Sequence, residues 1–145
     1  MTVLTLHQAT LVANGALEEG AAHGFDPLSV AVLDAGGHLV VFVREDGSGI
    51  LRPEIAIGKA YGALGFGLGG RALNAKNEKF LAAVAAASGG RMVPVPGGVL
   101  IRDPESDAII GAVGISGDNS GNDEIAAVTG IEAAGLKADP GTPEE

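Results

Sequence analysis

The chain has 145 residues, no cysteine and a formal net charge of −9. Its length is typical of one domain, and the lack of cysteine excludes disulfides, thiolate-bound zinc and cysteine nucleophiles. The acidic charge would repel nucleic acid and anionic lipid surfaces, so we expect neither as a partner.

Composition also bears on location and assembly. Hydrophobic residues make up 46% of the chain. No uninterrupted apolar run approaches the roughly 20 residues of a membrane span, and the first residues lack the pattern of a secretion signal. Together with the missing cysteines, this predicts a cytoplasmic protein without a membrane segment. The apolar content of so small a domain also predicts a homo-oligomer, a dimer or higher.

The start of the chain has the pattern of a helix followed by a hairpin. Apolar residues recur at helical spacing over 6–23, and Thr5 and Gln8 in front of them form a capping-box pattern. Two β-rich runs, 29–33 and 38–44, flank a short turn that contains two glycines. This arrangement predicts an antiparallel hairpin.

The middle of the chain predicts two more helices, over 54–64 and 72–87, separated by the glycine-rich stretch 65–70. A last helix is predicted over 120–134. Between them lie three β-rich runs whose short connections require antiparallel pairing: 92–95, 99–102 and 109–116.

The order of elements is thus α-β-β-α-α-β-β-β-α, which predicts an α+β fold with a five-stranded antiparallel sheet flanked by helices. We place one domain over residues 1–137. A polar, acidic tail follows over residues 138–145 and is expected to be frayed.

Three histidines could ligate a metal or haem iron, namely His7, His23 and His38. His23, at a helix end, and His38, beside the hairpin turn, are the two weak candidates. No pair has the i, i+4 spacing of a helical metal site, and a lone histidine is more often a surface or capping residue. His38 is also a candidate for proton transfer.

Two cations lie on largely apolar segments. Arg44 ends the second β-run, and Lys59 lies in a helix rich in alanine, isoleucine and glycine. A buried cation requires a carboxylate partner or an anionic ligand. Either could bind a ligand, or each could form an ion pair with Glu54 or Asp123 or extend to water.

The loop 114–121 leads from a strand into a helix start, where backbone N–H groups can hold an anion. Ser116 and Gly117 are therefore candidates for ligand binding. Asp123 and Glu124 lie in the first helical turn that follows. They are candidates for catalytic proton transfer, although negative charge there also stabilises the helix dipole.

Four segments together resemble the GlcG/HbpS family, also called the haem-degrading or DUF336 domain. They are DAGGHLVVFVRED at 34–46, GKAYGAL at 58–64, VPVPGGVLIRD at 93–103 and IIGAVGISGDNSGNDEIAAVTGIEAAGL at 109–136. The resemblance implies a profilin-like fold, assembly into homo-oligomers and a small-molecule ligand such as haem or a related tetrapyrrole. It does not identify an axial ligand.

Two functions follow as hypotheses. In the first, the protein binds haem, with Arg44 or Lys59 meeting the porphyrin carboxylates and a histidine approaching the iron. In the second, a small enzyme or enzyme-associated factor acts on a carboxylate or carbonyl metabolite, with Asp123 or Glu124 moving the proton. A purely structural oligomer is a weaker third alternative. Both hypotheses require the two cations to converge with the loop 114–121.

Overall fold

A single antiparallel sheet forms the centre of the computed structural model, which describes residues 2–142. Its elements are α1 (Leu6–His23), β1 (Ser29–Asp34), β2 (Leu39–Arg44), α2 (Arg52–Phe66), α3 (Gly70–Asn74), α4 (Glu78–Ala87), β3 (Gly98–Arg102), β4 (Ile109–Ser116), α5 (Ser120–Ala133) and β5 (Lys137–Asp139). The strand order is β2-β1-β4-β3-β5, and every pairing is antiparallel. The predicted α+β fold with five antiparallel strands is therefore confirmed.

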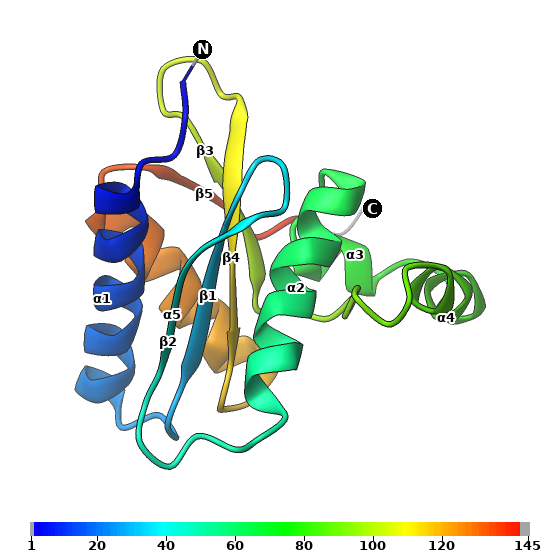
Figure 1. The fold of residues 1–145 in the computed structure, drawn as a ribbon, viewed down its shortest axis with the longest axis horizontal. Helices are drawn as coiled ribbons and strands as arrows, with labels where there is room; N and C mark the ends of the chain where they lie inside the picture. The colour runs from blue at the N-terminus through cyan, green and yellow to red at the C-terminus, as the bar shows by residue number, and fades with distance from the viewer. Residues whose placement is uncertain (1, 143–145) are drawn as a thin grey trace.

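The helices cover the sheet in two layers. Helices α1 and α5 pack together on one face, and α2 lies on the other, with α4 standing apart from the sheet (Figure 1). The larger hydrophobic core lies under α1 and α5, while a smaller core lies between α2 and the sheet. None of the helices in residues 2–142 has the length and hydropathy needed to cross a membrane.

The first helix begins and ends where the sequence predicts. The Thr5 side chain accepts a hydrogen bond from the Gln8 N–H at 3.0 Å, and the Gln8 side chain accepts one from the Thr5 N–H at 3.0 Å. Gly24 follows the helix in the left-handed conformation, with φ 66°. The capping box and the glycine stop are both confirmed.

The prediction of a single helix over 72–87 is wrong, because the chain forms two helices, α3 and α4, in this region. Asn77 begins α4, since its side chain accepts hydrogen bonds from the N–H groups of Lys79 and Phe80. A new N-terminal cap inside an alanine-rich run interrupts the preceding helix. The helix predicted over 54–64 is longer than expected and continues to Phe66, so the chain breaks at Gly67, with φ 63°.

The strand predicted over 92–95 is also wrong. The Val93 N–H donates to the Gly58 carbonyl at 3.0 Å, so this segment bonds to α2 and not to the sheet. The fifth strand is β5, which pairs with β3 and runs across the boundary that we placed after residue 137. The first two residues of the tail expected to be frayed, 138 and 139, are therefore part of a strand, whereas residues 143–145 lie outside the described residues.

Helix α2 lies unusually close to the sheet. A Cβ atom at Gly114 would come within 1.9 Å of the Ala56 carbonyl oxygen, and one at Gly98 within 2.3 Å of the Lys59 carbonyl oxygen. Only glycine permits this backbone contact, since any side chain would occupy the space of the helix. The close approach carries Lys59 directly to the end of β4.

Candidate functional site

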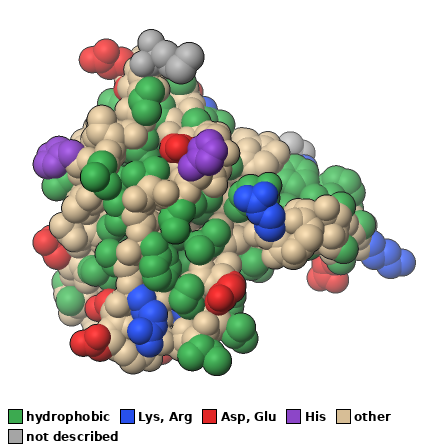
Figure 2. Space-filling view, viewed as in Figure 1, with side chains coloured by type: hydrophobic (Ala, Val, Ile, Leu, Met, Phe, Trp, Pro, Cys, Tyr) green, Lys and Arg blue, Asp and Glu red, His purple; other side chains and the backbone are tan. Residues whose placement is uncertain are grey.

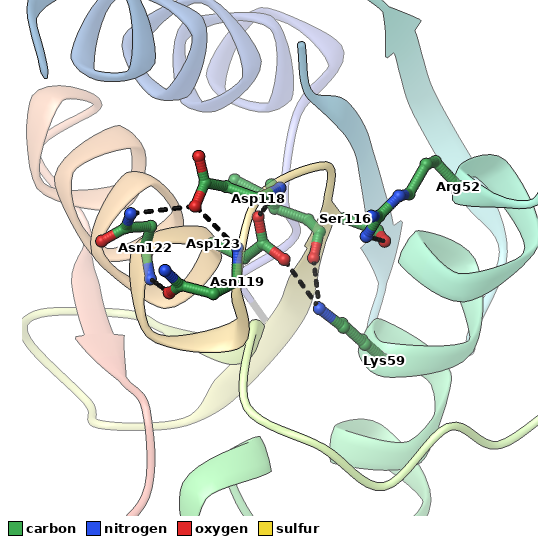
Figure 3. A network of polar contacts seen from close by, with 8 residues as sticks. Arg52, Lys59, Ser116, Asp118, Asn119, Asn122 and Asp123 are labelled. Carbon is green, nitrogen blue, oxygen red and sulfur yellow. Dashed lines mark hydrogen bonds and ion pairs between the residues drawn. The ribbon is translucent and has the colours of Figure 1, made fainter. Parts of the chain in front are cut away.

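A buried ion pair links the middle of α2 to the start of α5. The Lys59 Nζ donates to Asp123 Oδ2 at 3.1 Å and to the Ile115 carbonyl at 2.8 Å (Figure 3). The two side chains are only 3% and 1% exposed. The sequence therefore placed Lys59 correctly beside the loop 114–121, and of the open alternatives the ion pair with Asp123 is the one observed.

Burial governs the protonation of this pair. Desolvation raises the pKa of Asp123 and lowers the pKa of Lys59, and the attraction between the two charges opposes both shifts. The second oxygen of Asp123 accepts a hydrogen bond from the Asp118 N–H at 2.9 Å. Both groups thus have protein partners, and their predicted roles in ligand binding and catalysis stay predictions.

The rest of this network fixes the loop that precedes α5. The Arg52 guanidinium donates to the Ser116 hydroxyl at 3.0 Å, and Asn122 donates to the Asp118 carboxylate at 2.9 Å (Figure 3). A Cβ atom at Gly117 would come within 2.2 Å of the Pro27 carbonyl oxygen. Arg52 was not predicted as a site residue, because no local pattern links it to a serine 64 positions away.

Arg44 lies outside this network. Its Nε donates to the Ser48 carbonyl at 3.3 Å. Within residues 2–142, its side chain makes no hydrogen bond or ion pair with Lys59 or with the loop 114–121. The two predicted cations therefore do not meet in one site, and Arg52 takes the place beside Ser116 that Arg44 was expected to fill.

Glu124 has a different environment from the adjacent Asp123. Its carboxylate is 7% exposed and is bound by the Arg71 guanidinium, whose Nη2 lies 2.5 Å from Oε1. The pair borders a pocket of about 310 Å³. The adjacent acids, each predicted as a candidate for proton transfer, therefore have separate partners, Lys59 and Arg71.

A second polar site lies at the β1–β2 turn. The His38 Nδ1 lies 3.1 Å from Asp34 Oδ1, and the same oxygen accepts hydrogen bonds from the N–H groups of Gly36 and His38 at 2.9 and 3.0 Å. Desolvation acts to raise the pKa of Asp34, but these hydrogen bonds hold it below its ordinary value. In the tautomer that carries its proton on Nδ1, this N–H donates a hydrogen bond to the ionised Asp34 carboxylate, and the Nε2 lone pair of His38 is available.

The turn holds this imidazole in an accessible position. The His38 side chain is 80% exposed. A Cβ atom at Gly36 would lie 2.8 Å from the imidazole Cε1, so a glycine is needed for the ring to fold back over the turn. A pocket of about 230 Å³ adjoins the ring and has Leu4 and Ile110 among its apolar walls.

Beyond the turn, the surface carries an aromatic ring and a cation. A Cβ atom at Gly37 would touch the Tyr61 ring at 3.5 Å, and the Arg91 guanidinium lies 3.9 Å from the centre of that ring. One of the histidines visible in Figure 2 has an acidic side chain against it and hydrophobic side chains close by. The turn therefore combines a nitrogen donor, an apolar surface and a nearby positive charge.

The second candidate histidine is less favourably placed. His23 Nε2 lies 2.5 Å from Glu19 Oε1, and its ring stacks against Phe25. No group of three or more histidine and acidic side chains within residues 2–142 could hold a metal ion. A bare metal site built only from protein ligands is therefore not found in the described part of the chain.

The sequence belongs to a known family. Residues 4–132 match the HbpS-like family, described as haem degrading protein HbpS-like. Because the match covers most of the chain, the protein is a member of this family, as its resemblance implied. No curated protein sequence matches the chain.

Solved structures agree with this assignment. A structure described as the PduOC:heme complex shares 24% identity, covers 99% of this chain and 100% of its own, and has a TM-score of 0.84. The Klebsiella pneumoniae protein ORFY, of family DUF336, shares 21% identity, covers 93% and 92%, and has a TM-score of 0.81. A double mutant of Streptomyces reticuli HbpS shares 28% identity, covers 91% and 87%, and has a TM-score of 0.75. The first two, below 25% identity, show a shared fold.

Proposed function

We propose that the protein binds haem and that the Nε2 atom of His38 is the axial ligand of the iron. The observation that carries the proposal is the hydrogen bond between Nδ1 of His38 and the Asp34 carboxylate on an exposed turn. Membership of the HbpS-like family and the haem complex of a structural relative support the ligand class.

The residues at the turn fit a haem better than a bare ion. A histidine that ligates a metal usually donates its other N–H to a carboxylate, which fixes the tautomer and raises the basicity of the ligating nitrogen. Asp34 supplies that carboxylate. Since the porphyrin nitrogens provide the equatorial ligands, one protein donor is enough, and a cluster of three is not needed.

The surface around His38 suits the rest of the group. Leu4 and Ile110 provide apolar contact on one side of the imidazole, and Arg91 over the Tyr61 ring provides a cation for carboxylates on another. When bound, haem would supply redox or ligand-binding chemistry at its iron. The protein would contribute the axial nitrogen and its orientation. Arg91 takes the role that we predicted for Arg44 or Lys59.

A haemin titration tests both parts of the proposal. Addition of haemin to the purified protein is expected to shift the Soret band to the position of a histidine-ligated haem, and His38→Ala should abolish that shift. His23→Ala is the matched control and should behave like the wild type. A wild-type protein without a Soret shift would refute haem binding itself. An unchanged shift in His38→Ala would leave haem binding standing and refute His38 as the ligand.

Two further predictions, about oligomeric state and cellular location, belong to this proposal. We infer a homo-oligomer, supported by the large apolar side chains that remain exposed, among them Leu39 at 52%, Ile50 at 88% and Leu51 at 67%. Light scattering after size exclusion tests it, and a monomer at all accessible concentrations would refute it. A cytoplasmic location stays the expectation from composition, and cell fractionation tests it.

A further inference from the structure

A pocket on the side of α5 shares no residue with the haem site proposed above. It has a volume of about 310 Å³, near the lower end of the range for small-molecule sites. Ion-paired charges lie at its edge, and aliphatic side chains and a hydroxyl complete its lining: Arg71, Glu124, Ile125, Val128, Thr129 and Pro140. The pocket therefore combines both signs of charge with an apolar wall.

Backbone hydrogen bonds fix the walls of this pocket. The Arg71 N–H donates to the Pro140 carbonyl at 3.1 Å, which ties α3 to the segment after β5. A Cβ atom at Gly69 would come within 2.0 Å of the Pro140 carbonyl carbon, so the two backbones are in direct contact. The Asp139 side chain accepts hydrogen bonds from Arg102 at 2.9 Å and from the Gly141 N–H at 3.1 Å. The segments that carry Arg71 and Pro140 are thus held together by backbone contacts.

Polar groups at the pocket retain unused hydrogen-bonding capacity. Arg71 bonds Glu124 through Nε and Nη2, but its Nη1 makes no hydrogen bond with any of residues 2–142. The Thr129 hydroxyl likewise has no hydrogen-bond partner in that range. Among the side chains that the structure describes, the Glu124 carboxylate accepts from Arg71 alone, although it has room for further donors.

The charge pattern selects the class of ligand. A simple carboxylate would be attracted by Arg71 and repelled by Glu124. A simple amine would be attracted by Glu124 and repelled by Arg71. A zwitterion can satisfy both, with its carboxylate on the guanidinium and its ammonium on the buried glutamate. Ile125, Val128 and Pro140 would contact an aliphatic side chain. We propose that this pocket binds an α-amino acid with a small aliphatic side chain.

Amide chemical shifts in a ¹H–¹⁵N spectrum test the proposal, with L-leucine as the probe. Leucine is expected to bind with a dissociation constant on the order of 1 mM, and to shift the amides of Arg71, Ile125 and Thr129. Two matched analogues each lack one charge: 4-methylpentanoate lacks the ammonium, and 3-methylbutylamine lacks the carboxylate. Each should bind at least about tenfold more weakly than leucine.

Variants connect the binding to the named charges. Arg71→Gln and Glu124→Gln should each weaken leucine binding at least about tenfold, and Thr129→Val should weaken it less. Lys137→Gln, which removes an exposed ion pair with Asp107, is the control and should leave it unchanged. Spectra without ligand show whether each variant is folded. If a charge variant is unfolded, Thr129→Val provides the test of the pocket instead.

Three results would overturn the proposal. They are no shift with leucine in the wild type, binding of either single-charge analogue as tight as that of leucine, and unchanged affinity in every pocket variant. This proposal and the haem proposal can fail independently, because leucine binding should be the same in His38→Ala as in the wild type.

Discussion

The buried pair of Lys59 and Asp123 allows a sharp prediction about stability. Lys59→Met removes the cation but keeps much of its length, so Asp123 stays buried at 1% exposure without a counter-charge. The Ile115 carbonyl also loses its donor from Lys59. Removal of one partner of a buried ion pair costs about 3–5 kcal/mol, which is a large part of the stability of a domain of this size. The variant should therefore be strongly destabilised at neutral pH.

The pH dependence of the loss has a defined sign. Desolvation raises the pKa of Asp123, so the folded protein holds this proton more tightly than the unfolded chain, in which an aspartate has a pKa of about 3.9. Stability then falls as pH rises through the interval between the two pKa values. In Lys59→Met the largest opposing effect, the attraction to Lys59, is lost, and only the Asp118 N–H hydrogen bond and the weaker attraction of Arg52 still hold the pKa of Asp123 down. The destabilisation relative to the wild type should thus be smallest near about pH 4 and increase toward neutral pH.

The complementary variant should show the opposite trend. In Asp123→Asn, Lys59 stays buried without its carboxylate, and desolvation lowers its pKa below the value of about 10.4 in the unfolded chain. The unfolded state then binds more protons, so stability increases as pH rises toward about 10. Asp123→Asn should thus be most destabilised at low and neutral pH and recover in alkaline solution.

Urea unfolding followed by circular dichroism, at acidic, neutral and alkaline pH, measures these effects. The control is the double variant Lys59→Met with Asp123→Leu, because an apolar pair of similar volume is often tolerated better than a lone buried charge. It should be more stable than either single variant at neutral pH. A loss below about 1 kcal/mol in both single variants, without opposite pH trends, would refute a dry, coupled pair.

Two further predictions concern packing. Gly114→Ala places a methyl group against the Ala56 carbonyl and should lower the free energy of unfolding by about 1–3 kcal/mol or more. Gly65→Ala, inside α2 and with no described atom outside its own helix within 4 Å of the new Cβ, should raise it by about 0.5–1 kcal/mol, because alanine stabilises a helix relative to glycine. Similar values for the two in thermal or urea unfolding would contradict the close packing of α2. Truncation after Leu136 removes β5 and the partner of Arg102, and should lower the urea midpoint with a loss of about 1–3 kcal/mol. An unchanged midpoint would show that β5 contributes no stability.

The elements that could be predicted are those whose signals are local. The cap at Thr5, the stop at Gly24 and the β1–β2 hairpin each depend on residues within a few positions of one another. The strand order could not be obtained in the same way. Strand β5 has only three residues in a polar segment, and it exists because β3 presents an edge to which they can bond. Tertiary context therefore decided the fifth strand.

The candidate sites divide in the same manner. The sequence indicated His38 as a candidate, and Asp34 lies only four positions before it, so their pairing could have been predicted from the turn. Arg71 was missed because its partner, Glu124, is 53 positions away, and its own neighbourhood reads as a glycine-rich loop. The predicted approach to the loop 114–121 is correct for Lys59 and wrong for Arg44. Lys59 is buried, and a buried cation requires a carboxylate partner.

The glycines of this chain connect its fold to its proposed sites. Because Gly98 and Gly114 let the backbone of α2 lie directly on the sheet, the helix needs no large side chains there and can bury Lys59 against Asp123. The same close approach brings Tyr61 against the β1–β2 turn, beside His38. Helix α2 thus contacts the start of α5 through Lys59 and the β1–β2 turn through Tyr61. Loosening α2 by a bulky substitution at position 114 should therefore weaken haem binding as well as stability, whereas His38→Ala should affect haem binding alone.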